Sequence, residues 1–315
     1  MKAVQFAEHG DASVLRLVDL PIPQPGAGEV LIAVAAAGVN YADIWQRKGA
    51  GPTPLPLPYV PGYEVAGTIA ALGNGVATAL LGQRVMAMLP HGGYAAYVVV
   101  PAAQVIALPA ELGYAAATAL LAQGPTAVGL LNTGPYASVL VLAAAGGVGS
   151  LLVQVAKNRG IRVVAAVGSP AKKAAAQASG ADAVVCYADA DWVQQVRAAT
   201  DGLGVAATFD AVGGRVGTEA LQALGAGGTG VVYGAASGEP TMVAAQDLLG
   251  QQQLVRGYTV FAELPRLGEY TEELLGYLRA GQLRLPVQTY PVAAAETAQL
   301  DLEARRTTGK VVLLF

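Results

Sequence analysis

Cysteine and histidine are scarce in this chain of 315 residues: Cys186 is its one cysteine, and His9 and His91 are its two histidines. A single cysteine excludes an intrachain disulfide and any cysteine-rich zinc site. Zinc takes three or four soft or imidazole ligands that converge tetrahedrally. The inventory therefore predicts no zinc site. Cys186 stands in the apolar run Val184-Val185-Cys186-Tyr187, where we expect a buried strand residue rather than a nucleophile.

Charge is also sparse. Charged residues make up 13% of the chain, the formal net charge is −3, and no basic block is present. Nucleic-acid-binding surfaces are strongly basic, so we expect no nucleic-acid partner. Between Arg84 and Lys157 the only charged residue is Glu111, but prolines and glycines interrupt this segment repeatedly. A membrane-spanning helix needs about 20 continuous apolar residues, so we expect no membrane partner. The first residues read as a strand without a signal-peptide layout, which favours a cytoplasmic protein.

The glycine-rich segment Ala143-Ala144-Ala145-Gly146-Gly147-Val148-Gly149 follows the apolar run 138–142, which is typical of a buried parallel strand. A helix with an apolar face follows it, and a second strand, 161–167, lies about 20 residues on. A glycine turn of this kind lets backbone N–H groups and the positive helix end approach a pyrophosphate. An ordinary strand-to-helix turn is the alternative. The flanking elements favour a dinucleotide-binding turn.

The end of the second strand indicates which dinucleotide is bound. An NAD-binding unit carries Asp or Glu there, to accept hydrogen bonds from the adenosine ribose. Here the strand ends in Gly168-Ser169-Pro170, with Lys172 and Lys173 one turn further. A hydroxyl and an ammonium suit a 2′-phosphate, because charge-assisted hydrogen bonds to phosphate are strong. The two lysines could instead belong to an exposed helix start, but the missing acid favours NADPH.

The order of predicted elements indicates an α/β protein with two domains. Closely spaced strands at 2–6, 15–19, 29–37, 64–72, 84–88 and 94–101 predict an antiparallel, barrel-like domain. Helices at 148–158, 170–178, 190–198 and 215–223 then alternate with strands at 138–142, 161–167, 182–187, 205–210 and 227–233, which predicts a parallel sheet. Helices at 269–280 and 293–305 and strands at 288–291 and 310–315 complete the chain. We therefore expect a Rossmann-type doubly wound domain, 125–261, inserted into a split β-rich catalytic domain, 1–124 and 262–315.

The segment Gly62-Tyr63-Glu64-Val65-Ala66-Gly67 resembles the Gly-His-Glu-x-x-Gly stretch of zinc-containing alcohol dehydrogenases, with Tyr63 in place of the histidine ligand. A cysteine ligand of those enzymes is likewise missing near Asn40. Over essentially its whole length the chain resembles the zinc-free medium-chain dehydrogenases/reductases, specifically NADPH:quinone oxidoreductases of the zeta-crystallin type. The resemblance rests on the segments 36–43, 60–67, 143–149, 180–187, 209–214 and 308–312.

The resemblance implies a GroES-like catalytic domain and a set of site residues. Asn40 and Asp43 would line the nicotinamide and substrate cleft, and Tyr41 and Tyr63 are the nearby hydroxyls that could supply a proton. The residues implied for cofactor binding, Asn40 among them, are Thr126, Gly146, Gly147, Val148, Gly149, Gly168, Ser169, Lys172, Tyr187, Val212, Gly213, Tyr233, Gly234, Ala235, Ser237 and Arg305.

Three of these residues have an alternative structural interpretation. Tyr187 could pack its ring against a helix at the end of a strand. Asn40 could satisfy backbone groups in a turn. Asp43 could cap the helical turn that runs through Trp45 and Arg47.

The predicted activity is hydride transfer from NADPH to a quinone, which needs no metal because a conjugated dicarbonyl delocalises the incoming charge. The protein then orients the cofactor in a dry cleft. One alternative is an NADPH-dependent enal or enoyl reductase, which would act on another conjugated carbonyl. A second is a non-enzymatic NADPH-binding protein.

The segment 253–261 alternates apolar and polar residues after the last crossover, so it should form the edge strand of the parallel sheet. An exposed apolar edge favours pairing with its own copy across a two-fold axis. We therefore expect a homodimer through this strand, the assembly that the resemblance also implies. The alternative is an edge covered by a loop of the same chain.

Overall fold

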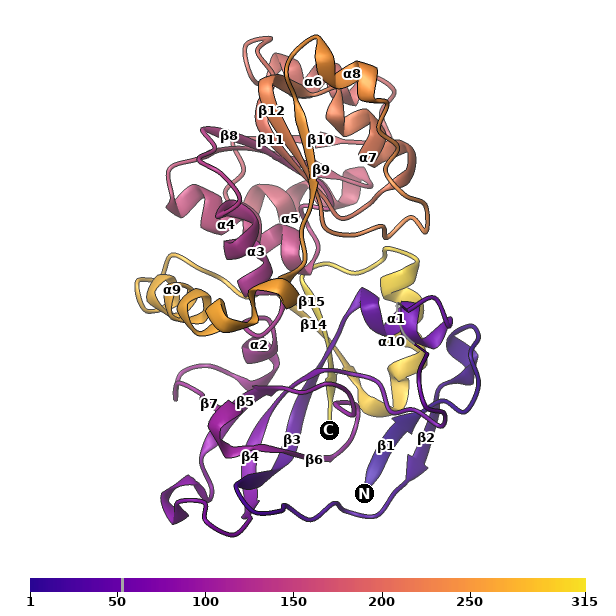
Figure 1. Ribbon diagram of the computed structural model, residues 1–315, viewed down its shortest axis with the longest axis vertical. Coiled ribbons are helices and arrows are strands. Elements are labelled where there is room, and N and C mark those ends of the chain that lie inside the picture. The colour runs from indigo at the N-terminus through magenta and orange to yellow at the C-terminus, as the bar shows by residue number, and fades with distance from the viewer. Residues whose placement is uncertain (52–53) are drawn as a thin grey trace. The chain divides into compact units, whose positions relative to one another are not determined.

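The computed structural model describes residues 1–51 and 54–315 (Figure 1). It divides into two compact units, which are described separately below. Unit 1 comprises Met1–Ala122 and Pro286–Phe315, and unit 2 comprises Gln123–Leu285. The expected second boundary, between 261 and 262, differs from this division. Residues 262–285 belong to unit 2 instead: the helix α9 (Leu267–Arg279) buries Tyr270, Leu274 and Leu275, and its Glu273 forms an ion pair with Arg159.

Unit 2 is built on a six-stranded parallel sheet. Its strands are β8 (Ser138–Val141), β9 (Arg162–Val167), β10 (Ala183–Cys186), β11 (Val205–Asp210), β12 (Leu224–Val232) and β13 (Leu254–Gly257). They lie in the order β10-β9-β8-β11-β12-β13. Counted along the chain this is 3-2-1-4-5-6, the order of a Rossmann fold, whose switch point lies between β8 and β11. The predicted doubly wound parallel sheet is confirmed.

Helices connect and cover these strands. They are α3 (Gln123–Leu131), α4 (Gly147–Asn158), α5 (Lys173–Ala178), α6 (Trp192–Ala198), α7 (Gly214–Leu221), α8 (Ala245–Leu249) and α9, with 3-10 turns at Pro170–Lys172 and Val260–Arg266. Trp192, Val196 and Ala220, from α6 and α7, pack on one face of the sheet. Figure 1 shows α4 and α5 on the other side. Val139, Leu140 and Val141 of β8 are fully buried, as expected for a strand that is covered on both faces.

Unit 1 is β-rich and closes around a separate core. A two-stranded sheet joins β1 (Lys2–Gln5) and β2 (Arg16–Asp19). The larger sheet contains β3 (Glu29–Val39), β4 (Glu64–Leu72), β5 (Arg84–Met88), β6 (Tyr97–Pro101), β7 (Ile106–Ala107), β14 (Val287–Pro291) and β15 (Lys310–Leu314). The order is β14-β15-β3-β4-β5-β7, with β6 also paired to β3. This is the split β-rich domain that the sequence predicted.

Three α-helices accompany the described part of the unit 1 sheet: α1 (Tyr41–Arg47), α2 (Tyr114–Thr118) and α10 (Ala295–Glu303). Short 3-10 turns lie at Ala12–Val14, Thr78–Leu80, Ala102–Gln104 and Val292–Ala294. The order of the sheet explains where α1 begins. The end of β3 lies between the beginnings of its antiparallel neighbours β4 and β15, so three strand ends meet at Asn40, the residue before α1.

The edge strand of unit 2 is shorter than predicted. β13 ends at Gly257, and the Tyr258 N–H still bonds the Val232 carbonyl. Thr259 then caps the 3-10 turn Val260–Arg266 by accepting a hydrogen bond from the Phe261 N–H. The expected strand over 253–261 is therefore wrong in its last residues, because the Thr259 hydroxyl favours a turn at a position where the pattern alone favours a strand.

Candidate functional site

The turn between β8 and α4 has the geometry of a pyrophosphate cradle. Ala143 has φ 49°, and Gly146 is the N-cap residue of α4. A Cβ on Gly149 would lie 2.4 Å from the Ala143 carbonyl oxygen, so the helix packs against the strand end more closely than any side chain permits. The first backbone N–H groups of a helix have no acceptor within it. Gly147, Val148 and Gly149 therefore present donors at the positive end of α4, where a pyrophosphate binds.

The corner after β9 brings together two of the residues predicted for the 2′-phosphate. The Tyr187 hydroxyl lies 2.8 Å from the position that a Cβ on Gly168 would take. Ser169 is the N-cap of the 3-10 turn that ends at Lys172. Lys173 faces Asp189 instead, with 3.9 Å between Nζ and Oδ2. No carboxylate follows β9 within this turn, which runs from Gly168 to Lys173.

The same tyrosine also packs in the way that its alternative interpretation expected. Its ring meets Trp192 edge-to-face, with centroids 6.4 Å apart. Packing against α6 and a hydroxyl beside Gly168 are compatible, because the ring and its polar tip face different neighbours. The role of Tyr187 at a phosphate stays a prediction.

Asp210 ties together the two loops predicted to run beside the dinucleotide. Its Oδ1 accepts hydrogen bonds from the N–H groups of Val212 (2.7 Å) and Gly213 (2.9 Å), and its Oδ2 accepts one from the Thr241 hydroxyl. A backbone hydrogen bond from the Ser237 N–H to the Val212 carbonyl oxygen adds to this connection. The 210–214 turn and the 233–241 segment therefore form one support.

The glycines of this support are required by close packing. Gly213 has φ 72°, and a Cβ there would lie 2.3 Å from the Glu239 carbonyl oxygen. A Cβ on Gly234 would lie 3.1 Å from the Ala211 carbonyl oxygen, and Ala235 packs against Gly213. Burial raises the pKa of the Tyr233 phenol above its usual range. Tyr233 is therefore a neutral hydroxyl at neutral pH.

Two further residues were assigned to the cofactor. Thr126 lies in α3 and is almost fully buried. Arg305 belongs to unit 1, where it follows α10 with φ 58° and lies within electrostatic range of Tyr41. Its assignment to the 2′-phosphate stays a prediction.

The candidate catalytic residues of unit 1 gather where β3 ends. Asn40 is the N-cap of α1, and its N–H donates to Asp43 Oδ2 at 2.8 Å, which completes a capping box. The Tyr94 hydroxyl donates to the same oxygen at 2.9 Å. Asp43 is 0% exposed. Its carboxylate therefore acts as the helix cap considered above and is enclosed from any ligand.

Burial controls protonation in this cluster. It raises the pKa of the Asp43 carboxyl from 3.8 to about 6, although the Asn40 and Tyr94 hydrogen bonds oppose the shift. Burial, followed by the charges of Glu64 and Asp43, raises the pKa of Tyr63 well above 10. Tyr41 is half-buried against Trp45, and its pKa is raised mainly by burial as well. Both tyrosines keep their protons at neutral pH, so each can donate a proton and neither is a base.

The zinc donors of the sequence do not converge. His9 faces the Arg47 carbonyl, His91 packs on the Tyr59 ring, and Cys186 lies in β10 of unit 2. Within residues 1–51 and 54–315, no group of three or more His, Cys, Asp or Glu side chains could hold a metal ion. The same residues include no helix that is long and apolar enough to cross a membrane.

Comparisons with known proteins now add to this geometry. The family model described as "Alcohol dehydrogenase GroES-like domain" matches residues 26–110, and the one described as "Zinc-binding dehydrogenase" matches residues 147–275. A probable quinone oxidoreductase of Schizosaccharomyces pombe is 35% identical, covering 99% of this chain and 96% of the relative. The chain belongs to the quinone oxidoreductase family of medium-chain dehydrogenases/reductases. The resemblance found in the sequence is confirmed.

Solved structures agree with this family. The Escherichia coli quinone oxidoreductase complexed with NADPH superposes on this chain with a TM-score of 0.92 at 29% identity. The match covers 100% of both chains. The mycobacterial protein Rv1454c complexed with NADPH has a TM-score of 0.91 at 36% identity, again over the whole of both chains. The GroES-like and Rossmann-type fold predicted from the sequence is thereby confirmed. Despite the name of one matching family model, the donor positions described above do not fit zinc.

The sequence interpretation missed four polar residues: the buried Glu64 and Lys310 in unit 1, and the buried Asp210 with its partly buried partner Thr241 in unit 2. Two of them carried a usable signal. Asp210 stands between an apolar strand and Gly213-Gly214, as an Asx turn requires. Lys310 is the one charged residue in the apolar strand that ends the chain. Glu64 and Thr241 show their roles only through partners distant in sequence.

Proposed function

We propose that this protein is a zinc-independent oxidoreductase that transfers hydride from NADPH to a quinone. The observation that carries the proposal is the pair of sites in unit 2: a helix N-terminus opened by Gly146–Gly149 and a strand end at Gly168 without an acidic residue. Full-length relatives named quinone oxidoreductase and neighbours solved with NADPH support it.

The residues of unit 2 fit this cofactor. Gly147, Val148 and Gly149 would donate backbone N–H groups to the pyrophosphate, and the absence of a side chain on Gly149 lets α4 begin close against the end of β8. Ser169, Lys172 and the Tyr187 hydroxyl would hold the 2′-phosphate. The 210–214 turn, fixed by Asp210, and the loop from Tyr233 to Ser237 would support the remainder.

NADPH supplies the hydride when it is bound. The chain's own part is to orient the reactants, to exclude water and to allow one proton to reach the reduced quinone. Tyr41 and Tyr63 remain protonated at neutral pH and are the candidate donors, with water as the other source. Asn40, at the N-terminus of α1, is the amide of unit 1 assigned to the reacting groups.

The decisive experiment is a steady-state panel with NADPH or NADH as donor. Acceptors are 1,4-benzoquinone, 1,2-naphthoquinone, 2-alkenals and crotonyl-CoA, each assayed before and after prolonged chelation. The proposal expects the highest kcat/KM for NADPH with a quinone and no loss after chelation. Activity that follows stoichiometric zinc, or a preference for NADH, would contradict it.

A second candidate function is NADPH-dependent reduction of an activated alkene. A relative from a Burkholderia species named 2-haloacrylate reductase is 31% identical, covering 94% of this chain and 93% of the relative. A higher kcat/KM for 2-alkenals or 2-chloroacrylate than for either quinone would establish this function instead. Tight NADPH binding with no turnover of any acceptor would favour the non-enzymatic binding protein.

The proposal includes a cytoplasmic homodimer that pairs through β13. This strand is at the edge of its sheet, and the Leu254 side chain on it is 62% exposed. The Tyr258 N–H points to β12, so alternation directs the Val255 N–H to the open edge. Val255→Pro should therefore disrupt self-pairing without breaking the ladder to β12. Light scattering should find a dimer for the wild type, and a wild-type monomer of about 32 kDa at micromolar concentration would refute edge pairing.

A further inference from the structure

A buried ion pair lies directly beneath Asn40. Lys310, the first residue of β15, and Glu64, the first of β4, are 1% and 0% exposed, and the Lys310 ammonium contacts Glu64 Oε1. The ammonium also donates to Asn40 Oδ1 at 2.9 Å and to the Val39 carbonyl at 3.1 Å. A lysine ammonium has three donors. All three have acceptors here: two belong to the consecutive residues Val39 and Asn40 at the end of β3, and the third is Glu64 of β4.

The ion pair binds both ends of the Asn40 carboxamide. Its oxygen accepts from Lys310, and its Nδ2 donates to Glu64 Oε1 at 2.7 Å. Rotating the amide by 180° would place its NH2 group against the ammonium and its oxygen against the carboxylate. Both contacts would be repulsive, and in a buried site a repulsive polar contact is costly. The ion pair therefore selects one of the two amide orientations.

Gly38 makes room for this arrangement. A Cβ on Gly38 would lie 2.1 Å from Glu64 Oε1 and 2.7 Å from both Cγ and Cδ of the same side chain. The glutamate thus lies flat across the backbone of β3, two residues before Asn40. Because β4 and β15 flank β3, this path brings the carboxylate to the ammonium.

A buried ion pair needs an explanation beyond stability. Removing two charges from water is so costly that apolar residues of similar volume often stabilise a fold equally well or better. The charges at Glu64 and Lys310 nevertheless lie at the one place where they fix a candidate site residue. Their effect is directional, since the ammonium and the carboxylate bind opposite ends of the same amide.

We propose that Lys310 and Glu64 are positioning residues that hold the Asn40 carboxamide in a single orientation for the reaction. The inference rests on the proposed function for its consequence on turnover. The fixed orientation of the Asn40 amide does not depend on that function.

The first experiment is a double-mutant cycle with NADPH and 1,4-benzoquinone. Asn40→Ala and Lys310→Met should each lower kcat/KM, and the combined variant should be no worse than Asn40→Ala by more than about twofold. In Lys310→Met, NADPH affinity measured by nicotinamide fluorescence should change by less than about threefold, because the residues proposed to hold the pyrophosphate and the 2′-phosphate are intact. The inference would be overturned if Lys310→Met lowered kcat/KM by the same factor in the wild type and in Asn40→Ala. It would also be overturned if Asn40→Ala kept the wild-type kcat/KM.

Gly38→Ala tests the same arrangement without changing any polar group. The added methyl must displace Glu64, so kcat/KM should fall by about fivefold or more in the wild-type background and not in Asn40→Ala. Gly113→Ala is the matched control in unit 1, because nothing lies within 4 Å of its Cβ position, and it should leave kcat/KM unchanged. If Lys310→Met fails to fold, the pair Lys310→Met with Glu64→Gln removes both charges and replaces it in the cycle.

A measurement without turnover separates this inference from the proposed function. In protein labelled with ¹⁵N-asparagine, the Asn40 side-chain amide is assigned by its loss in Asn40→Ala. One of its protons should exchange slowly with solvent in the wild type and rapidly in Gly38→Ala. Equal exchange in the two proteins would overturn the inference whatever the panel shows. An inactive wild type with the slow proton present would refute only the quinone activity.

Discussion

At the turn after β8 the functional groups are backbone N–H donors, and the side chains around them are small or absent. At the end of β3 the functional groups are side chains, and charged residues enclosed by strands hold them in place. The first site depends on the close backbone packing that Gly149 permits, and the second on polar contacts to Asn40. An added methyl group should therefore damage the first site most, and a changed charge the second.

The largest effect is expected where backbone packing is tightest. Gly149→Val places a branched side chain where even a Cβ would lie 2.4 Å from the Ala143 carbonyl oxygen, so α4 must move from β8. Overpacking of this kind costs about 1–3 kcal/mol, and NADPH affinity should fall by about 100-fold. Isothermal titration would measure it. Gly276→Val in α9, where nothing lies within 4 Å, is the matched control and should bind NADPH normally.

The next effect concerns a single charge in unit 2. Lys172→Ala should weaken NADPH by roughly 10- to 100-fold and leave NADH almost unchanged, because a charge-assisted hydrogen bond contributes about 1.5–3 kcal/mol. Fluorescence titration with both cofactors provides the measurement. Lys173→Ala removes the same charge from the residue that faces Asp189, and we expect less than about a threefold change. Equal losses for the two variants would show that only the net charge matters.

A smaller effect is expected from the buried carboxyl of unit 1. The pKa of Asp43 is about 6 in the folded protein and 3.8 in an unfolded chain, so its contribution to stability is present below pH 3.8 and is lost as the pH rises through 6. Asp43→Asn should remove this dependence. The stability of the wild type relative to the variant should then fall by about 1–2 kcal/mol between pH 5 and pH 7.5.

Denaturant unfolding at the two pH values would test this prediction. Asp247→Asn, which removes an exposed carboxyl of α8, is the control and should follow the wild type. A constant difference between wild type and Asp43→Asn across this range would mean that Asp43 is ionised in the fold at pH 5.

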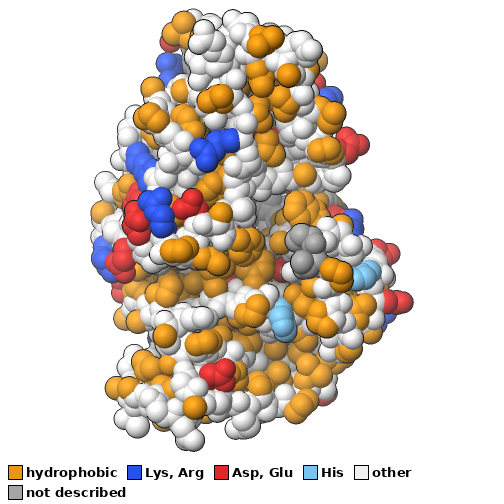
Figure 2. Space-filling model, viewed as in Figure 1, with side chains coloured by type: hydrophobic (Ala, Val, Ile, Leu, Met, Phe, Trp, Pro, Cys, Tyr) orange, Lys and Arg blue, Asp and Glu red, His pale blue; other side chains and the backbone are white. Residues whose placement is uncertain are grey.

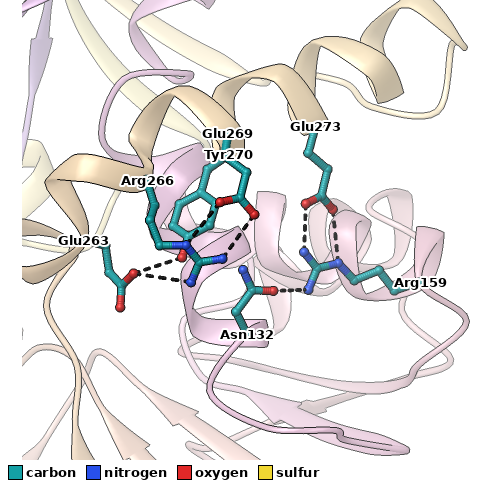
Figure 3. A network of polar contacts seen from close by, with 7 residues as sticks. All are labelled: Asn132, Arg159, Glu263, Arg266, Glu269, Tyr270 and Glu273. Carbon is teal, nitrogen blue, oxygen red and sulfur yellow. Dashed lines mark hydrogen bonds and ion pairs between the residues drawn. The ribbon is translucent and has the colours of Figure 1, made fainter.

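The smallest effect belongs to the half-buried polar network that joins α9 to α3 and α4. Figure 3 shows the Arg159 guanidinium between Asn132 and Glu273, with Nη2 2.9 Å from Glu273 Oε2. Arg266 lies nearby between Glu263 and Glu269, above the Tyr270 ring. On the face seen in Figure 2, blue side chains likewise stand beside red ones. Such pairs are screened by water and salt.

Glu273→Gln should therefore cost about 0.5–1 kcal/mol, and this cost should shrink at high salt. Thermal unfolding at low and high ionic strength measures the loss of stability and its dependence on salt. Glu272→Gln, on the same helix but 69% exposed and 3.9 Å from Arg279, should change neither. If Glu273→Gln lowered the free energy of unfolding by more than about 3 kcal/mol, the Arg159–Glu273 pair would behave like a buried ion pair and the prediction would be wrong.

The parallel sheet was predictable because its first four strands, β8 to β11, are short and largely apolar and each is followed by a helix. The order of those elements is sufficient to define a Rossmann unit. The helix α3 was missed for the opposite reason. All its residues are buried, so it has no polar face and no 3.6-residue period, and it carries Gly124 and Pro125 in its first turn. The second domain boundary was placed before α9 in the sequence, but α9 belongs to unit 2, where its buried face and its Arg159 partner come from residues remote in sequence.

By itself the sequence determined the α/β class, the glycine turn and the missing acid after β9, because each of these depends on neighbouring residues and on the local geometry that they impose. The network around Asn40 was decided by the tertiary structure alone. Gly38, Glu64 and Lys310 belong to three strands, and only antiparallel pairing brings Val312 opposite Gly38 and Val65 opposite Ala37. Buried charges must find partners wherever the fold provides them. In this protein the partners lie 24 and 270 residues along the chain from Asn40.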